Sequence, residues 1–313
     1  MRIHLDTDLA GDPDDVAALA YLLGREDVDL VGVTTVDDPG GRRAGFVHEV
    51  LRIAGRTDVP VVAGAEVSLT TGRPSGKLPT GPRYWPAEVA PRPGPLGTAL
   101  DLLSASVLSG AVVVGIGPAT TLARLDRRSP GVLSDAHVVL MGGSESPPGS
   151  GLPQYGAEDD WNVTCDPVAS TEVRYAAGRL TVVPLAVTAR VHLRDAHLPR
   201  LRAAGPLGWL MAGQAEAYRD DEGKRELGRA YAGLPDDLAN FHHDPLTAAV
   251  AAGWTGATVS PTPLRPMAGD EAGRWERTAA DDPAGRLVQL VVEVDGPAFA
   301  EHWLTTVGAL PRG

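Results

Sequence analysis

The sequence has almost no cysteine and no long hydrophobic run. Its 313 residues include one cysteine, Cys165, which excludes an internal disulfide and fits a reducing compartment. No apolar stretch reaches the roughly 18 residues that a membrane span requires, and residues 1–5 lack the apolar segment of a signal peptide. We therefore expect a cytoplasmic protein with no membrane partner.

Basic residues are scarce relative to acidic ones. The chain holds 28 lysines and arginines against 40 aspartates and glutamates, which gives a formal net charge of −12. Because a nucleic-acid-binding surface needs a basic stripe, this balance argues against a nucleic-acid partner. The apolar fraction of 43% and the chain length allow a large buried core. The composition therefore indicates a globular protein.

Short aliphatic segments alternate with amphipathic ones along the chain. The segments that predict strands are 3–6, 29–36, 59–63, 111–115, 137–141, 181–187 and 287–294. Those that predict crossover helices are 16–23, 43–54, 118–125, 167–177 and 245–252. Several strands are almost continuously apolar, as in parallel sheets covered on both faces. The alternation predicts an α/β fold with an open, mostly parallel, doubly wound sheet, whose sites lie beyond the carboxyl ends of strands.

Three regions interrupt this alternation. Segments 66–98 and 142–164 are rich in glycine and proline and predict long functional loops. Segment 206–243 is helical and charged in pattern, and we expect it to form helical cap elements over the sheet. No repeat or linker divides the chain, so we expect a single domain over residues 1–313.

Five aspartates crowd the first strand–helix turn, in LDTDLAGDPDDVAAL at residues 5–19. Asp12 precedes a proline and makes a good helix N-cap, and Asp15 falls in the first turn, where the helix dipole favours a carboxylate. The half charge of a helix end does not balance the whole cluster, which includes Asp6 and Asp8. A divalent cation would balance it. Carboxylate oxygens without a neighbouring His/Cys cluster favour Ca²⁺, or Mg²⁺, over zinc.

Two enzyme families place paired aspartates at the end of a first strand. The dehalogenase-type phosphatases use D-x-D-x-[TV]; residues 6–10, DTDLA, begin this way but end in alanine, and no later lysine block is evident. Residues 6–17, DTDLAGDPDDVA, resemble the D-x-D-x-G-x-D-D-A signature of the inosine–uridine-preferring nucleoside hydrolases, with a turn two residues longer. The second family fits better, and the first remains an alternative.

Further segments extend this resemblance in the family's order. They are VGVTTV (31–36), VPVVAGA (59–65), GIGPATTLA (115–123), VVLMGG (138–143), DDWNVTCDPVAS (159–170), VVPLAVT (182–188) and HHDPLTAAV (242–250). Each segment alone is a weak match, whereas the ordered series is specific. The resemblance implies an N-glycosyl hydrolase that releases the base from a ribonucleoside or a related ribosyl compound.

The resemblance implies a metal centre that activates water. It assigns one Ca²⁺ to Asp8, Asp15, Asp244 and the carbonyl of Ile116, with ribose hydroxyls and a water completing the shell. It also makes Asp8 the general base, because Asp8 can touch both the ion and the water. Taken alone, Asp244 before a proline is an ordinary helix start.

The resemblance further implies the contacts with substrate. Asp14, Asp160 and Asn162 would bind ribose hydroxyls, and nearby negative charge would favour a cationic sugar in the transition state. His243 would assist the leaving base, although the neighbouring His242 competes for this role. The partner would be a small-molecule nucleoside, and the family resemblance implies a homodimer or a homotetramer.

Three positions depart from the family pattern. Pro39 stands where the family usually has an asparagine, Ala186 stands where it often has an aspartate, and RPGPLG at 92–97 lacks its histidine. The departures fall on the substrate-binding positions and leave the metal positions intact. They support a second hypothesis, in which the protein is a metal-containing nucleoside- or sugar-binding homologue without turnover.

Overall fold

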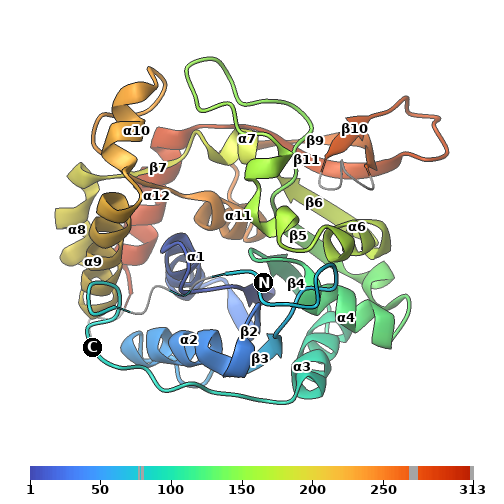
Figure 1. Ribbon diagram of the computed structural model, residues 1–313, viewed down its shortest axis with the longest axis horizontal. Helices are drawn as coiled ribbons and strands as arrows, with labels where there is room; N and C mark the ends of the chain where they lie inside the picture. Colours follow the sequence, from blue (N-terminus) through green and yellow to red (C-terminus); the bar gives the residue numbers. More distant parts are fainter. Residues whose placement is uncertain (77, 79–80, 268–273, 311–313) are drawn as a thin grey trace.

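The computed structural model describes residues 1–76, 78, 81–267 and 274–310, which form a nine-stranded sheet in the order β10-β9-β11-β6-β5-β4-β1-β2-β3 (Figure 1). The strands are β1 (Arg2–Thr7), β2 (Asp29–Val36), β3 (Val61–Ala65), β4 (Val112–Gly115), β5 (His137–Met141), β6 (Arg179–Val183), β9 (Ala257–Pro266), β10 (Trp275–Arg277) and β11 (Arg286–Val294). The run from β11 to β3 is parallel, and β9 pairs antiparallel with β10 and β11. The predicted mostly parallel α/β sheet is confirmed.

Helices cover both faces of this sheet. They include α1 (Asp14–Leu23), α2 (Arg42–Ile53), α3 (Leu96–Leu108), α4 (Thr120–Arg128), α6 (Pro167–Ala176), α11 (His243–Ala251) and α12 (Gly296–Gly308). Alternate strand residues enter different cores, as side chains on the two faces of a strand must. Val114 packs in the core with α1, α11 and α12, whereas Val113 packs in the core with α3, α4 and α6. The sheet is therefore doubly wound.

A smaller group of elements lies beside the sheet. It contains α8 (Leu198–Arg202), α9 (Pro206–Asp221), α10 (Lys224–Ala230) and an antiparallel pair, β7 (His192–Arg194) with β8 (Leu238–Phe241). Helices α9 and α10 confirm the prediction of helices in segment 206–243. Its last part is a strand instead, because residues 238–241 pair with β7. This group borders the pocket described below.

Some predicted elements end elsewhere in the structure. The strand predicted over 181–187 ends at Val183, because Pro184 precedes the short helix α7 (Leu185–Thr188). The loop predicted over 66–98 is shortened by α3, which begins at Leu96. Strand β9 and helix α12 were not predicted. In the described part of the chain, no helix combines the length and hydropathy needed to cross a bilayer.

Candidate active site

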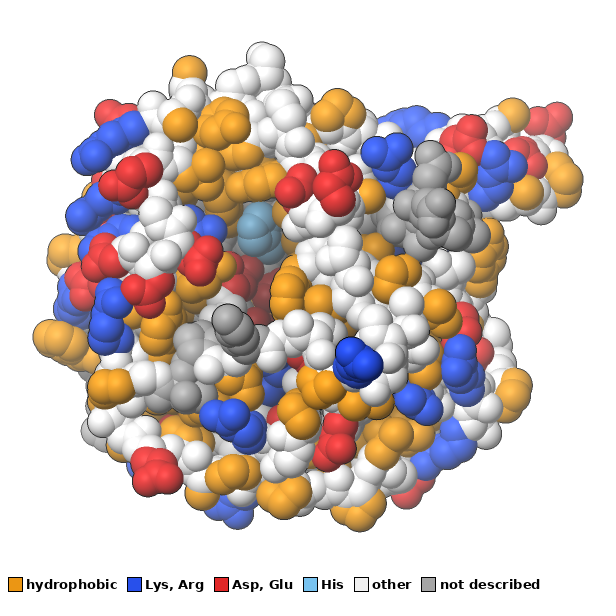
Figure 2. Space-filling model, in the orientation of Figure 1, with side chains coloured by type: hydrophobic (Ala, Val, Ile, Leu, Met, Phe, Trp, Pro, Cys, Tyr) orange, Lys and Arg blue, Asp and Glu red, His pale blue; other side chains and the backbone are white. Residues whose placement is uncertain are grey.

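The predicted site residues lie together in one pocket of about 860 Å³. Figure 2 shows a hollow at the centre of this face, with acidic side chains and a histidine visible inside it. The pocket is lined by all eight of the predicted residues: Asp8, Asp14, Asp15, Ile116, Asp160, Asn162, His243 and Asp244. They follow β1, β4 and β8 or begin α1, α5 (Trp161–Thr164) and α11, so the carboxyl ends of strands and the starts of helices build the site.

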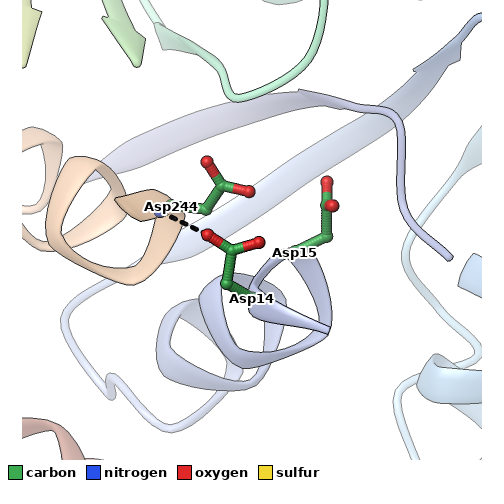
Figure 3. Close-up of side chains that lie close together, drawn as sticks. All are labelled: Asp14, Asp15 and Asp244. Atoms are coloured by element: carbon green, nitrogen blue, oxygen red, sulfur yellow. Dashed lines mark hydrogen bonds between the residues drawn. The ribbon is translucent and has the colours of Figure 1, made fainter. Parts of the chain in front are cut away.

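Three of the carboxylates form a tight group. Oxygen atoms of Asp14, Asp15 and Asp244 lie within 4.8 Å of one another. Asp14 and Asp15 begin α1, and Asp244 lies in the first turn of α11, so the starts of two helices converge here (Figure 3). The backbone N–H of Asp244 donates a hydrogen bond to Oδ2 of Asp14 at 3.1 Å, and the Thr7 hydroxyl donates one to Asp15.

The electrostatics of this carboxylate trio fit a cation site. Burial raises the pKa of Asp14, Asp15 and Asp244 well above the ordinary value, and repulsion among the neighbouring aspartates raises each pKa further. A positive ion among these oxygens would favour the charged forms. Because the three groups offer only oxygen atoms, the donor set suits a hard cation such as Ca²⁺ or Mg²⁺.

Asp8 lies beside the trio rather than within it. Its charge raises the pKa of Asp15, its Oδ2 accepts a hydrogen bond from Nε1 of Trp161 at 3.1 Å, and its carbonyl accepts one from the Arg43 guanidinium. Burial raises the pKa of Asp8, and the positive charge of Arg43 opposes that shift. Glycine is required at Gly117, where an added Cβ would lie 2.7 Å from Oδ1 of Asp8.

Asn162, predicted to bind the sugar, is hydrogen-bonded to Ile116, whose carbonyl is predicted to bind the metal. Nδ2 of Asn162 donates a hydrogen bond to the carbonyl of Ile116 at 2.9 Å. The Asp160 carboxylate accepts the backbone N–H groups of Gly143 and Val163, which makes Asp160 the N-cap of α5. All three residues line the pocket. Their contacts with sugar and metal stay predictions.

The adjacent histidines occupy different environments. His243 lines the pocket, with Nδ1 2.7 Å from Oγ1 of Thr188 and its ring stacked on Phe241 at 5.2 Å. Burial lowers the pKa of His243 to about 3, so its imidazole is neutral at neutral pH. His242 instead packs in the core, with its ring centroid 4.5 Å from that of Trp303, and it does not line this pocket. Of the two, His243 is the one placed to meet a ligand.

The remaining aspartates of the first turn also differ from each other. Asp6 is buried, and its Oδ1 accepts a hydrogen bond from the Thr34 hydroxyl at 2.5 Å, so it supports the turn from the core. The prediction that Asp12 is the N-cap is wrong by one residue, because Pro13 occupies the cap position of α1. Asp12 accepts hydrogen bonds from the Asp14 N–H and from Asn240, and it lines the pocket.

Arg43 is a site residue that sequence patterns did not reveal. It is 1% exposed, lines the pocket, and pairs with Asp37 through Nε to the carbonyl at 2.8 Å and through the second amino group to Oδ2 at 3.2 Å. The Asp37 carboxylate also accepts the backbone N–H groups of Ser75 and Gly76. This ion pair connects the Asp8 turn with the loop after β3. The available signal was an arginine at a position where the helix pattern calls for an apolar residue.

A second group missed by sequence patterns is aromatic and cationic. The Lys224 ammonium lies 4.9 Å from the ring centroid of Tyr218 and 5.6 Å from that of Phe241. Tyr155 packs edge-on against Phe241 at 6.2 Å. These four residues line the pocket. The sequence indicated only that segment 206–243 forms a cap, without saying which of its residues face the site.

The three departures from the family pattern lie outside the pocket lining. Pro39 is exposed, and the neighbouring Asp38 carboxylate accepts the N–H groups of Arg43 and Ala44 at the start of α2. Neither Ala186 nor the segment 92–97 lines the pocket. The chain therefore has no side-chain amide or histidine at these positions to contact a ligand.

Comparison with known proteins identifies the family that the chain resembles. Residues 3–301 match the model of the family described as inosine-uridine preferring nucleoside hydrolase. The pyrimidine-specific ribonucleoside hydrolase RihA of Escherichia coli is 26% identical over 248 residues, which cover 75% of each chain. An uncharacterized protein of Schizosaccharomyces pombe is 28% identical over 242 residues, covering 71% of this chain and 76% of that protein.

Solved structures show the same fold. A purine-preferring ribonucleoside hydrolase from Gardnerella vaginalis superposes with a TM-score of 0.79 and 23% identity, covering 100% of this chain and 99% of that chain. The plant nucleoside hydrolase PpNRh1 gives a TM-score of 0.78 and 21% identity, with 99% of each chain covered. The predicted architecture is thereby confirmed over the whole chain.

Proposed function

This chain belongs to the inosine–uridine-preferring nucleoside hydrolase family, and from that membership we propose how its pocket hydrolyses the N-glycosidic bond of a ribonucleoside. In this reaction water replaces the base at C1′ of the sugar. The observation that carries the proposal is the position of Asp8 beside three buried carboxylates in a single pocket. This arrangement supports a general base and a cation site that act on the same ligand.

We assign one Ca²⁺, with Mg²⁺ as the alternative, to Asp8, Asp15, Asp244 and the carbonyl of Ile116. The buried, mutually repelling carboxylates support this assignment, since their charge needs a partner. Asp14 belongs to the same oxygen cluster, so its carboxylate would lie close to the cation as well as to the sugar. When bound, the cation offsets the carboxylate charge and lowers the pKa of water in the pocket.

Asp8 is assigned as the general base. Its carboxylate lines the pocket beside the three clustered aspartates, where it can accept a proton from a water near the cation. The Trp161 indole holds Oδ2 of Asp8, which leaves Oδ1 to take a proton from water. As the water oxygen bonds to C1′, the C1′–N bond breaks and its electron pair leaves with the base.

Asp14, Asp160 and Asn162 are assigned to the ribose hydroxyls. The carboxylates close to the sugar stabilise the positive charge that develops on it, because their orientation is fixed before reaction. Thr188 holds Nδ1 of His243, so Nε2 of this neutral ring is left to hydrogen-bond with the leaving base.

Ribose release from a substrate panel tests the proposal. The purified protein would be incubated with purine ribonucleosides, pyrimidine ribonucleosides and p-nitrophenyl β-D-riboside, with and without a chelator. We expect ribose release that the chelator abolishes and Ca²⁺ restores, and that falls by about 10²- to 10⁴-fold in Asp8→Asn.

Two results would contradict the proposal. If calorimetry finds nucleoside binding and the ligand is recovered unchanged, the protein is a nucleoside-binding homologue of the family without turnover. If wild-type protein releases no ribose from any substrate in the panel, the hydrolytic assignment of this pocket fails. Ribose release that the chelator leaves unchanged would overturn the metal assignment alone.

We also propose that the protein is a cytoplasmic homodimer or homotetramer. Its one cysteine, Cys165, is buried and unpaired, which suits a reducing compartment. The assembly follows from the resemblance to the family. Sedimentation equilibrium of the full chain would measure its mass, and a monomer at micromolar concentration would contradict the proposed assembly.

A further inference from the structure

Lys224 is a cation of the pocket wall. It is the first residue of α10 and lines the pocket, with its ammonium over the rings of Tyr218 and Phe241. Within the described ranges, this ammonium has neither a hydrogen bond nor an ion pair with another side chain. Cation–π contacts hold an ammonium in place without accepting a conventional hydrogen bond from it, so an N–H donor can turn to a ligand.

A series of contacts along the pocket wall connects Lys224 to the carboxylate trio through Phe241 and His243. His243 immediately precedes Asp244 in the chain, and its ring stacks on that of Phe241 with the centroids 5.2 Å apart. Phe241 in turn lies 5.6 Å from the Lys224 ammonium. A sugar at the trio would therefore extend its base along His243 and Phe241 toward Lys224. Tyr155 and Tyr218 add flat aromatic surface to the same wall, which suits a planar base.

We propose that Lys224 is a catalytic residue that protonates the departing base. The inference rests on the proposed function of the pocket. The C1′–N bond breaks with its electron pair going to the base, and the Lys224 ammonium gives that base one proton. Asp8 takes one proton from the attacking water and afterwards releases it to solvent, and solvent returns a proton to the Lys224 amine. The products are ribose and the neutral base.

The chain's own composition makes this lysine distinctive. Only Lys77 and Lys224 are lysines among its 28 basic residues, and Lys77 lies outside the described residues. A lysine releases a proton far more readily than an arginine, which stays protonated in proteins. His243 can hydrogen-bond with the base through Nε2 while Lys224 supplies the proton. The proposed substrates are thus nucleosides whose base leaves poorly as an anion.

Leaving-group dependence tests the proposal. Lys224→Met removes the ammonium with little change in length, and Lys224→Arg keeps the charge but does not release a proton readily. We expect Lys224→Met to lower kcat for inosine and uridine by about 10²- to 10³-fold. Hydrolysis of p-nitrophenyl β-D-riboside should fall by less than about threefold, because p-nitrophenolate departs without a proton. Lys224→Arg should likewise lose activity on inosine and uridine and keep most of its activity on p-nitrophenyl β-D-riboside.

A matched control lies on the same helix. Arg225 is paired with Asp195 at 2.6 Å and does not line the pocket, so Arg225→Met removes a neighbouring cation without changing the wall. It should leave the ratio of nucleoside to p-nitrophenyl riboside activity unchanged. Near-ultraviolet circular dichroism of Lys224→Met that matches wild type would confirm that the variant folds.

The outcomes separate this inference from the proposed function. Equal losses on both substrates in Lys224→Met, or no loss on either, would overturn proton donation while wild-type hydrolysis upholds the function. Full nucleoside activity in Lys224→Arg would also overturn it. Wild-type protein that hydrolyses neither substrate would overturn the proposed function and this inference together.

Discussion

The indole Nε1 of Trp161 donates a hydrogen bond to Oδ2 of Asp8 at 3.1 Å. The two residues differ in exposure, since Asp8 is buried and Trp161 is 49% exposed. The bond joins the start of α5 to the turn after β1 and fixes one oxygen of the proposed base. A half-exposed aromatic residue therefore restrains the orientation of a buried carboxylate.

Trp161→Phe should weaken catalysis and shift its pH dependence. The variant loses a hydrogen bond to a charged group, and a loss of about 1.4 kcal/mol in the transition state lowers kcat about tenfold. Burial raises the pKa of Asp8 and the Trp161 bond lowers it, so removing the bond raises that pKa. The acid limb of kcat/KM should therefore move to higher pH. Trp209→Phe, at an exposed position on α9, is the control that should change neither.

Arg43→Met should destabilise the protein by leaving the buried Asp37 carboxylate without its cation. Breaking one partner of a buried ion pair costs about 3–5 kcal/mol. Urea denaturation measures this loss, and the double variant Asp37→Asn/Arg43→Met should recover part of it. Arg42→Met changes an exposed neighbour and should alter stability by less than about 0.5 kcal/mol. Equal stabilities of the Arg43 and Arg42 variants would contradict a structural role for the ion pair.

Calcium should raise the thermal stability of the folded protein. Binding to the native state alone adds about 2.7 kcal/mol when the free ion is at 100 times its Kd. The wild type should therefore melt at a higher temperature in CaCl₂ than in chelator. Asp15→Asn should lose most of this difference, and Asp101→Asn, on the exposed side of α3, should retain it. A calcium effect of the same size in both variants would place the ion elsewhere.

Without the cation, the carboxylate trio should make stability fall as pH rises. Burial and neighbouring aspartates raise the folded pKa of Asp244 well above its ordinary value of 3.8. Above pH 3.8 the unfolded chain releases this proton before the folded one does, so the contribution is lost as pH rises toward the folded pKa. The limiting slope is about 1.4 kcal/mol per pH unit for one proton.

Asp244→Asn isolates that contribution. In chelator, the unfolding free energy of the variant should rise relative to wild type as pH increases from 4 to 8, while the two converge at low pH. Urea denaturation at several pH values measures the difference. Parallel curves of unfolding free energy against pH for the two proteins would show that Asp244 does not contribute to the pH dependence of stability.

The site could be predicted from the sequence where residue patterns determine both the end of a strand and the start of the following helix. The end of β1 and the start of α1 follow from aliphatic and helical periodicity, and parallel strands bring their carboxyl ends to one edge. Asp8, Asp14 and Asp15 are therefore grouped by the sequence alone. Asp244 could be added only through the ordered family segments, because its partners are distant along the chain.

Other features depend on tertiary packing that periodicity does not encode. Arg43 is buried in α2 because Asp37 supplies its partner from the preceding turn. His242 and His243 differ by one position, and only the packing of α11 decides which one faces the core. Pro184 ends β6 where an aliphatic run continued the strand pattern. At such points the local backbone geometry overrides the intrinsic preference of the residues for a strand or a helix.

The hydrogen bond from the Asp244 N–H to Asp14 joins residues that are 230 positions apart. A growing chain that has made Asp14 and Asp15 still lacks the third carboxylate until most of its length has been synthesised. Under the proposed metal assignment, the cation site is therefore complete only late in folding, and a bound ion would link α1 to α11. A chain that ends before residue 244 would keep its acidic turn but would hold the ion poorly.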